Sequence, residues 1–391
     1  MAVIDENISN FVNEHRNDDV RTLALHATRY PNVDMHEAAT QIEGWQHACA
    51  KLPEWAAVDG IIYPPRISME QCSSSPTALY KASLMNGETF ADLTGGFGID
   101  CSYISKKFSK AFYIERNERL CAVATHNFSL LGLEHIEIIN GNCEDVLQAL
   151  PSCDWIFMDP ARRDGAGKKV VALADCEPDV AALRTLLLQK ARRVMIKCSP
   201  MLDITAACRQ LDSVAQVHVV AVNNECKELL FVLTSELVAA PLVRCVNIAG
   251  GTMQEFSFCM DDAHEAAFAV EVGNFLYEPN AAIQKAGCPS SLASAYGVQK
   301  LHPNSNLYTS SVAVENFPGR SFRVTALSGF SKGEIKNLLG DLKRANVTVR
   351  NFPETVQQLR KRLKLSEGGD VYLFATTLAD GRKVLVRCEK G

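Results

Sequence analysis

The chain has 391 residues, of which 47% are hydrophobic and 22% are charged, and its formal net charge is −5. This composition is that of a globular protein and excludes a disordered chain, while the length predicts two or three domains because one hydrophobic core seldom grows so large. No apolar run is long enough to cross a bilayer, so a membrane protein is excluded as well.

Residues 1–85 are predicted to form a helical region. Apolar residues recur at spacings of three and four in residues 8–11, 20–27 and 36–50, and prolines at positions 31, 64 and 65 separate these stretches. The region is acidic, with 11 acids against 6 bases. Its opening segment, MAVIDENISNFVNEHRNDD, is polar and unlike a signal peptide, so we expect a cytoplasmic location.

From Thr89 the pattern changes to short apolar strands that alternate with amphipathic helices. The expected strands are TFADLTG, AFYIE, IEIIN, WIFMDP and RVMIKCS. The expected helices between them span residues 99–108, 118–131, 143–150, 178–190 and 201–211. Strands that are apolar throughout, in such an alternation, favour a parallel sheet covered by helices on both faces. We assign residues 86–238 to this α/β domain.

The last two strands of the domain are expected to differ from the others. AQVHVVAV and ELLFVLTS are separated only by NNECK. This connection is too short for a helical crossover, so the two strands must pair antiparallel. A parallel, doubly wound sheet that ends in a hairpin is not expected of a nicotinamide dehydrogenase.

The remaining residues are predicted to form two smaller α+β domains, at 239–320 and 321–391. The first contains the strands PLVRCVNI, MQEFSFCM and FLYEP and two short helices around residues 280–286 and 290–297. The second reads strand FRVTAL, helix SKGEIKNLLGDLKRA, strand VTVRNF, helix ETVQQLRKRLKL and strands VYLFATTL and RKVLVRCE, with Asp380-Gly381 as the final hairpin turn. From Ser331 onward 13 bases face 7 acids, and a basic terminal module favours a polyanionic partner.

A glycine-rich motif follows the first strand of the α/β domain and opens a helix. It reads Asp92-Leu-Thr94-Gly95-Gly96-Phe-Gly98-Ile-Asp100. Glycines let the backbone turn sharply and approach a ligand closely, and amides at a helix start favour an anionic group. Taken alone, the motif also fits a dinucleotide site or a tight turn.

Polar residues at three further strand ends support a ligand site. Glu115 ends the second strand, where an acid can accept hydrogen bonds from both hydroxyls of a ribose. Asn142 follows the third strand, where it can bond an adenine amino group, cap the next helix, or do both. Asp159-Pro160-Ala161-Arg162-Arg163 ends the fourth strand, at the edge where ligands bind in open α/β sheets.

These motifs resemble those of class I S-adenosylmethionine-dependent methyltransferases. The resemblance implies that S-adenosylmethionine is the cofactor and that it contacts the glycine-rich motif, Glu115 and Asn142. It implies a catalytic role for Asp159, Pro160 and Arg162, because this motif is similar to the D-P-P-R type of RNA methyltransferases. Ala161 replaces the second proline, which leaves the target atom open, and the motif is not the N-P-P-[YF] pattern of adenine-N6 enzymes.

The resemblance extends over essentially the whole chain. The segment Glu70-Gln71-Cys72-Ser73-Ser74, the methyltransferase core and the C-terminal L-R-K-R-L-K-L…G-G-D-V-Y-L-F segment are similar to bacterial methyltransferases with a THUMP-like domain. The fold implied is α/β: a Rossmann-like sheet preceded by a helical region and followed by ferredoxin-like and THUMP-like α+β domains. THUMP domains imply RNA as the partner, either tRNA or rRNA.

Basic residues at two places are candidates for RNA contacts. Arg163, Lys168 and Lys169 follow the fourth strand, beside the expected transfer site, and Arg360, Arg362 and Lys364 lie on one predicted helix. A solvated basic face is the alternative for the helix. Cys198 ends the fifth strand, where a thiolate could attack a pyrimidine carbon, although a structural cysteine is the simpler interpretation.

Metal chemistry is not expected, and two other functions compete with RNA methylation. The 14 cysteines are scattered without a C-x-x-C pair, and the histidines show no metal-ligand spacing, so we expect no metal. A small-molecule methyltransferase uses the same core but usually lacks a basic terminal module. A non-catalytic RNA-binding protein that keeps the fold is the third possibility, for which Ala161 is the main argument.

Overall fold

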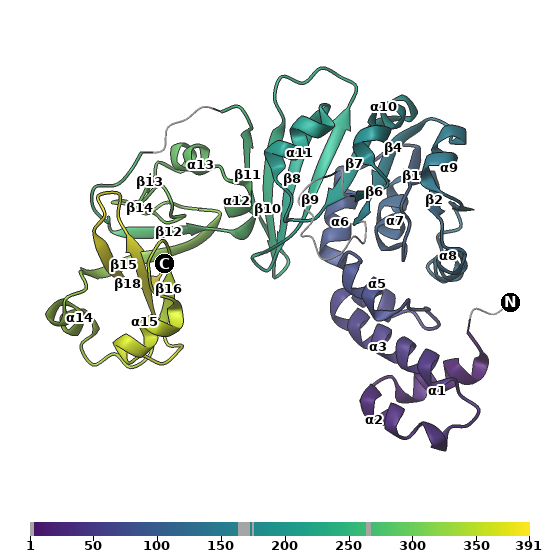
Figure 1. Ribbon diagram of the computed structural model, residues 1–391, viewed down its shortest axis with the longest axis horizontal. Coiled ribbons are helices and arrows are strands. Elements are labelled where there is room, and N and C mark those ends of the chain that lie inside the picture. The colour runs from purple at the N-terminus through teal and green to yellow at the C-terminus, as the bar shows by residue number, and fades with distance from the viewer. Residues whose placement is uncertain (1–3, 163–172, 174–175, 263–266) are drawn as a thin grey trace. The chain divides into compact units, whose positions relative to one another are not determined.

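The computed structural model describes residues 4–162, 173, 176–262 and 267–391 (Figure 1). The chain divides into two compact units, residues 1–217 with 228–239 and residues 218–227 with 240–391. No helix among the described residues is long and apolar enough to span a membrane.

The first unit begins with a helical region. Its helices are α1 (Glu6–His15), α2 (Val20–Leu25), η1 (Ala27–Arg29), α3 (Met35–Lys51), α4 (Pro53–Ala56), α5 (Arg66–Gln71) and α6 (Ser75–Leu84). Aspartates 5, 19 and 34 start three of them by accepting hydrogen bonds from backbone amides of the first turn. Their apolar faces form a small core around Phe11 and Ile42. The predicted helical region is confirmed, although the short helices α4 to α6 were not resolved by the apolar spacing.

The sheet of the first unit follows the predicted topology (Figure 1). Its strands are β1 (Thr89–Asp92), β2 (Lys110–Glu115), β3 (Ile136–Asn140), β4 (Cys153–Met158), β7 (Ala191–Cys198) and β9 (Glu225–Thr234), in the order β9-β7-β4-β1-β2-β3. All neighbours pair parallel except β9, which runs antiparallel to β7. Because consecutive residues of β1, β2 and β4 are buried, both faces of the sheet are covered.

Helices and one hairpin connect these strands. The helices are α7 (Ile99–Ile104), η2 (Ser105–Lys107), α8 (Glu118–Leu130), α9 (Cys143–Ala149), α10 (Val180–Lys190) and α11 (Ile204–Leu211). β8 (Val214–Val222) is the sheet neighbour of β9, and Asn223 and Asn224 turn the chain between them with φ of 50° and 62°. Positive φ at two asparagines is typical of a tight hairpin, so the predicted final hairpin is confirmed.

The second unit contains a hairpin and a seven-stranded sheet. The hairpin is β10 (Leu242–Ala249) with β11 (Thr252–Cys259). The sheet has the order β13-β14-β12-β15-β18-β17-β16, formed by β12 (Phe275–Pro279), β13 (Gln299–Lys300), β14 (Tyr308–Ser310), β15 (Gly319–Ser328), β16 (Asn346–Val349), β17 (Val371–Thr377) and β18 (Lys383–Lys390). The helices are α12 (Ala281–Ala286), α13 (Pro289–Tyr296), α14 (Lys332–Leu339) and α15 (Val356–Leu363).

Side chains of β17 and β18 alternate between two hydrophobic cores in this unit. Phe374 and Val386 belong to one apolar cluster, whereas their neighbours Leu373 and Leu385 pack with residues of α14 and α15. Successive side chains of a strand point to opposite faces, which is why one sheet can serve two cores. α14 is shorter than predicted because Gly340 takes a φ of 52° directly after it and ends the helix.

Candidate active site

The strand register brings the predicted site residues to one edge of the first unit's sheet. Asp92, at the end of β1, is level with Phe157, and Glu115, at the end of β2, is level with Asn140. Met158 of β4 pairs with Ile196 of β7, so the next residue along each strand, Asp159 or Lys197, lies at the same edge. The carboxyl ends of parallel strands are the usual ligand site of such sheets.

The loop after β1 requires glycine at two positions. Gly95 donates its amide hydrogen to Ile114 O at 2.8 Å, and a Cβ atom here would lie 2.3 Å from the Tyr113 ring. Gly98 takes a φ of 86°, and a Cβ atom here would meet the Phe128 ring at 2.7 Å. Beside Gly96, by contrast, a Cβ atom would meet nothing closer than 3.7 Å, so the space on that side of the backbone is free. The Gly96 amide and carbonyl oxygen themselves are hydrogen-bonded to the Glu115 carboxylate and the Tyr113 hydroxyl.

Glu115 ties the second strand to this loop. Its Oε2 accepts a hydrogen bond from the Gly96 amide at 2.9 Å, and its Oε1 accepts one from the Asn117 amide at 2.8 Å. Each carboxylate oxygen keeps another acceptor position, so Glu115 can still receive two hydroxyl donors. Asn142 is the N-cap residue of α9, but its side chain makes no capping hydrogen bond. Both side chains therefore retain the capacity that the sequence predicted for them.

Asp92 and Thr94 connect the loop to the end of β4. The Thr94 amide donates to Asp92 Oδ1 at 3.0 Å, and the Thr94 hydroxyl accepts a hydrogen bond from the Asp159 amide at 2.7 Å. Burial raises the pKa of Asp92 to about 8, and the carboxylates of Asp100, Asp159 and Glu115 contribute to this shift. Asp92 is therefore mostly protonated at neutral pH.

Asp159 is half-exposed and forms an ion pair with a lysine that was not among the predicted site residues. Its Oδ2 lies 2.5 Å from Nζ of Lys197, at the end of β7.

The other predicted residues of this motif follow Asp159 along the chain. Pro160 is half-buried, and the Arg162 backbone forms the short strand β5 (Ala161–Arg162) with β6 (Cys176–Glu177). The predicted contacts of Arg163, Lys168 and Lys169 lie outside the described residues.

Asp100 is nearly buried among charged and polar groups of the protein. Its side chain is 9% exposed and lies 3.2 Å from Nζ of Lys81 and 3.8 Å from Nζ of Lys197, while the Ser73 hydroxyl donates to its Oδ2 at 2.8 Å. Burial opposes ionisation, but the two lysines and Ser73 together lower the pKa of Asp100. Asp100 thus belongs to a buried charge cluster that also includes Glu228.

Sequence reasoning missed Lys81, Lys197 and Glu228. Lys81 is fully buried in α6, and its Nζ donates to Glu228 Oε1 at 2.6 Å and Oε2 at 2.8 Å. One signal was available in the sequence, since Lys197 directly follows the apolar run at 194–196 and Glu228 directly precedes the apolar run at 229–233. A charge at such a position is seldom buried without a partner.

Cys198 does not offer a nucleophile. Its side chain is buried, and burial raises the pKa of the thiol well above its ordinary value. Because the thiolate is the attacking form of cysteine, this environment disfavours a covalent step on carbon.

The helix α15 presents fewer unpaired charges than its sequence suggested. Arg360 Nη2 lies 3.0 Å from Glu367 Oε1, and Arg362 Nη1 lies 2.6 Å from Glu354 Oε1. Lys364 is the C-cap residue, with a φ of 56°. Two of the three predicted RNA contacts on this helix are thus already in ion pairs.

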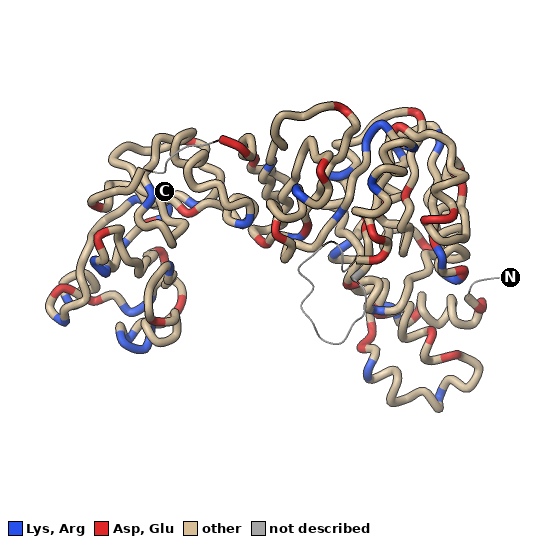
Figure 2. Tube along the Cα trace, turned by 45° about the horizontal axis from the view of Figure 1, so that its top comes forward, with Lys and Arg blue, Asp and Glu red and all other residues tan. Residues whose placement is uncertain are grey.

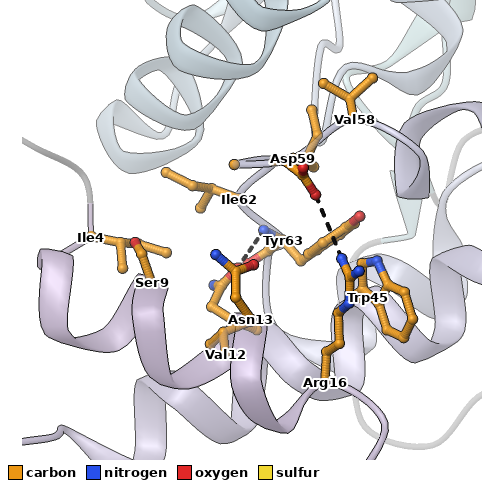
Figure 3. A pocket seen from close by; sticks show the side chains of 13 residues that line it. Ile4, Ser9, Val12, Asn13, Arg16, Trp45, Val58, Asp59, Ile62 and Tyr63 are labelled. Carbon is orange, nitrogen blue, oxygen red and sulfur yellow. Dashed lines mark hydrogen bonds and ion pairs between the residues drawn. The ribbon is translucent and has the colours of Figure 1, made fainter.

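A hollow in the first unit lies among α1, α3 and residues 58–63 (Figure 3). Arg16 lies in it, 3.5 Å from Asp59 and 4.8 Å from the centre of the Trp45 ring. None of the predicted site residues lines this hollow. Within the described ranges, no group of three or more His, Cys, Asp or Glu side chains could hold a metal ion.

Comparisons with known proteins identify the family. Family models described as a ferredoxin-like domain and as THUMP domain-like match residues 275–318 and 319–390. A crystal structure of an inferred methyltransferase from Porphyromonas gingivalis W83 is similar over 99% of both chains, with 34% sequence identity and a TM-score of 0.89. This chain belongs to the class I methyltransferases with a THUMP-like domain.

Two more distant relatives of this methyltransferase carry the cofactor in their names. They are uncharacterized S-adenosylmethionine-dependent methyltransferases of two Mycobacterium tuberculosis strains, CDC 1551 and H37Rv. Each is 23% identical over 318 residues, which cover 80% of this chain and 84% of the relative. S-adenosylmethionine is accordingly the cofactor of this methyltransferase. The acceptor positions left on the Glu115 carboxylate could receive its ribose hydroxyls.

Replacing Glu115 with alanine is expected to weaken cofactor binding about 10–150-fold, because charge-assisted hydrogen bonds worth roughly 1.5–3 kcal/mol are lost. Isothermal titration of the folded variant with S-adenosylmethionine measures this change. Glu118→Ala is the matched control, since Glu118 is an exposed acid three residues further on. Unchanged affinity in a folded Glu115 variant would remove the ribose assignment.

Proposed function

We propose that this methyltransferase transfers the methyl group of S-adenosylmethionine to a base of an RNA, either a tRNA or an rRNA. The THUMP-like match at residues 319–390 carries the proposal, because THUMP domains imply RNA. The excess of basic residues from Ser331 onward supports it. The proposed domain division is 1–85, 86–238, 239–320 and 321–391.

The proposed cofactor site comprises the loop after β1 and two side chains from neighbouring strand ends. Thr94, Gly95, Gly96 and Gly98 would approach the cofactor through the backbone, with Asp92 beneath them. Glu115 would accept the ribose hydroxyls, and Asn142 would bond the adenine amino group. We propose that Asp100 supports this site from the buried charge cluster instead of touching the cofactor, since its partners are protein groups.

The proposed transfer site is Asp159 with Pro160 and Arg162. S-adenosylmethionine supplies an activated methyl group, so the protein mainly has to position the acceptor and exclude water. Within the part of the chain that the structure describes, Lys197 holds Asp159 Oδ2, and Asp159 Oδ1 has no partner. That oxygen could accept a hydrogen bond from an N–H of the acceptor and orient the nitrogen's lone pair. The buried thiol of Cys198 supports nitrogen over carbon as the acceptor.

A transfer assay tests the function directly. The protein is incubated with tritium-labelled S-adenosylmethionine and with fractions of total RNA, DNA and small metabolites. We expect label in RNA, and we expect Asp159→Ala to reduce it about 100-fold because misplacing the acceptor costs this much, which is far more than its effect on cofactor affinity. Label in the metabolite fraction alone would favour a small-molecule substrate, and full transfer by the variant would place the reaction elsewhere.

The ion pairs of α15 predict which of its bases would bind RNA. Figure 2 shows Lys and Arg of the second unit interspersed with Asp and Glu. Lys361 and Lys364 are exposed, whereas Arg360 and Arg362 would have to leave their glutamates. We expect Lys361→Gln with Lys364→Gln to flatten the slope of log affinity against log salt by about 0.7–0.9 per lost phosphate contact.

The matched control for this prediction is the double variant Arg360→Gln with Arg362→Gln, which removes the same charge. We expect it to change the slope less than the lysine pair does. Filter binding of total tRNA and rRNA at several salt concentrations compares the two variants. Equal, unchanged slopes would show that α15 is only a solvated surface.

A further inference from the structure

Lys197 lies where two carboxylates of the proposed active site meet. Its Nζ is 2.5 Å from Asp159 Oδ2 and 3.8 Å from Asp100 Oδ2. The side chain of Lys197 is 11% exposed and that of Asp159 is 39% exposed, so the pair bridges the interior and the strand-end surface. Burial alone would lower the pKa of Lys197, but Asp159, Asp100 and Glu228 together raise it, so the ammonium group stays charged.

A second lysine satisfies the interior side of the cluster without Lys197. Lys81 holds both oxygens of Glu228, contacts Asp100 at 3.2 Å and donates to the Ser73 hydroxyl at 3.1 Å. The cluster therefore contains three carboxylates, Asp100, Asp159 and Glu228, against two ammonium groups. Removing Lys197 would leave Asp159 without a described cation and increase the negative charge at the strand ends.

We propose that Lys197 is a positioning residue for methyl transfer: it fixes Asp159 with Oδ1 directed to the acceptor, and it offsets the carboxylate charge that the cofactor's transferable group meets. This proposal rests on the proposed function, which places the reaction at Asp159. It assigns Lys197 an electrostatic role that a merely structural lysine would not have. The consequence is that Lys197 sets how strongly the site distinguishes a cationic from a neutral ligand at the methyl position.

Binding of two cofactor analogues measures the effect of the Lys197 charge without a methyl acceptor. S-adenosylhomocysteine has a neutral sulfur, whereas sinefungin has an ammonium-bearing carbon in place of the sulfonium and its methyl group. Lys197→Met is expected to increase the preference for sinefungin over S-adenosylhomocysteine about tenfold, because one nearby positive charge is removed. Asp159→Asn is expected to decrease the same preference about tenfold, and the double variant should return close to the original value.

Isothermal titration of both analogues into the full-length protein measures these ratios. Lys190→Met is the control, because Nζ of Lys190 donates to the carbonyl oxygens of Gln148 and Leu150, away from the charge cluster, and its ratio should not change. An unchanged ratio in Lys197→Met, or an equal loss of affinity for both analogues, would overturn the proposal. If Lys197→Met does not fold, the double variant is compared with Asp159→Asn alone, and their ratios should still differ about tenfold.

The binding experiment separates this proposal from the proposed function. An absence of label in every RNA fraction would end the RNA assignment but would leave the analogue ratios to decide the role of Lys197. Conversely, RNA methylation with unchanged ratios would confirm the substrate and remove the role of Lys197.

Discussion

Replacing Lys81 with methionine is expected to destabilise the first unit by about 3–5 kcal/mol, since the change leaves buried carboxylates without their cation. Lys81 is fully buried, and Glu228 and Asp100 are also nearly inaccessible to solvent. Methionine fills a similar volume, so the loss would come from the uncompensated charge and not from a cavity. Urea unfolding measures the free energy of unfolding of the variant.

Tryptophan fluorescence makes this measurement specific to the unit. All three tryptophans of the chain, at positions 45, 55 and 155, belong to the first unit. The control Lys110→Met disrupts an exposed pair, in which the Lys110 and Glu137 side chains are about half accessible, and should cost at most about 1 kcal/mol. Adding Glu228→Gln to the Lys81 variant should restore much of the loss. A Lys81 variant as stable as its control would show that the cluster does not hold α6 to the sheet.

The sequence predicted the strands, most helices and the strand-end residues because these depend on local patterns. Apolar runs and glycine positions fix where β1, β2 and β4 lie, and parallel pairing then brings Asp92, Glu115 and Asp159 to one edge. The motif residues Thr94 and Gly96 also contact other strand-end residues, since the Asp159 amide and the Glu115 carboxylate reach them across the sheet.

The charge cluster could not be predicted in the same way. Lys81 and Glu228 are 147 positions apart, and no local pattern indicates that two residues so distant will form an ion pair. Likewise, α15 looked basic along its length because its sequence does not show that Glu354 and Glu367, which flank the helix, reach back to Arg362 and Arg360. Pairing of this kind depends on tertiary structure, which hydrophobic periodicity does not encode.

Asp92→Asn is expected to make the first unit more stable than the unmodified protein at pH 8 but not at pH 5. Burial raises the pKa of Asp92 to about 8 in the folded protein, whereas an unfolded aspartate titrates near 3.9. The folded state therefore binds more protons between these values, and its stability falls as pH rises through that window. The stabilisation is complete below about pH 4 and is lost as pH passes about 8.

The size of the effect follows from the width of the window. Each pH unit between the two pKa values costs roughly 1.4 kcal/mol, so the difference between the two proteins should change by about 3–4 kcal/mol from pH 5 to pH 8. Asparagine stands in for the protonated acid, since its side-chain oxygen can still accept the Thr94 amide hydrogen. Urea unfolding followed by tryptophan fluorescence at pH 5, 6, 7 and 8 measures both proteins. If the free energies of unfolding of the two proteins change with pH in parallel, Asp92 is not protonated in the folded protein over this pH range.

The cofactor should reduce this pH dependence if Asp92 lies beneath it, as we propose. Asp92 keeps its proton partly because Asp100, Asp159 and Glu115 surround it with negative charge. A bound cation offsets that field and favours the ionised form. S-adenosylmethionine, with its sulfonium, should therefore bind more tightly as pH rises from 6 to 8, and S-adenosylhomocysteine should change less. In Asp92→Asn the two ligands should respond to pH alike. If the pH response of the two ligands differs as much in this variant as in the unmodified protein, another group near the sulfonium titrates, and Asp92 is not part of the cofactor site.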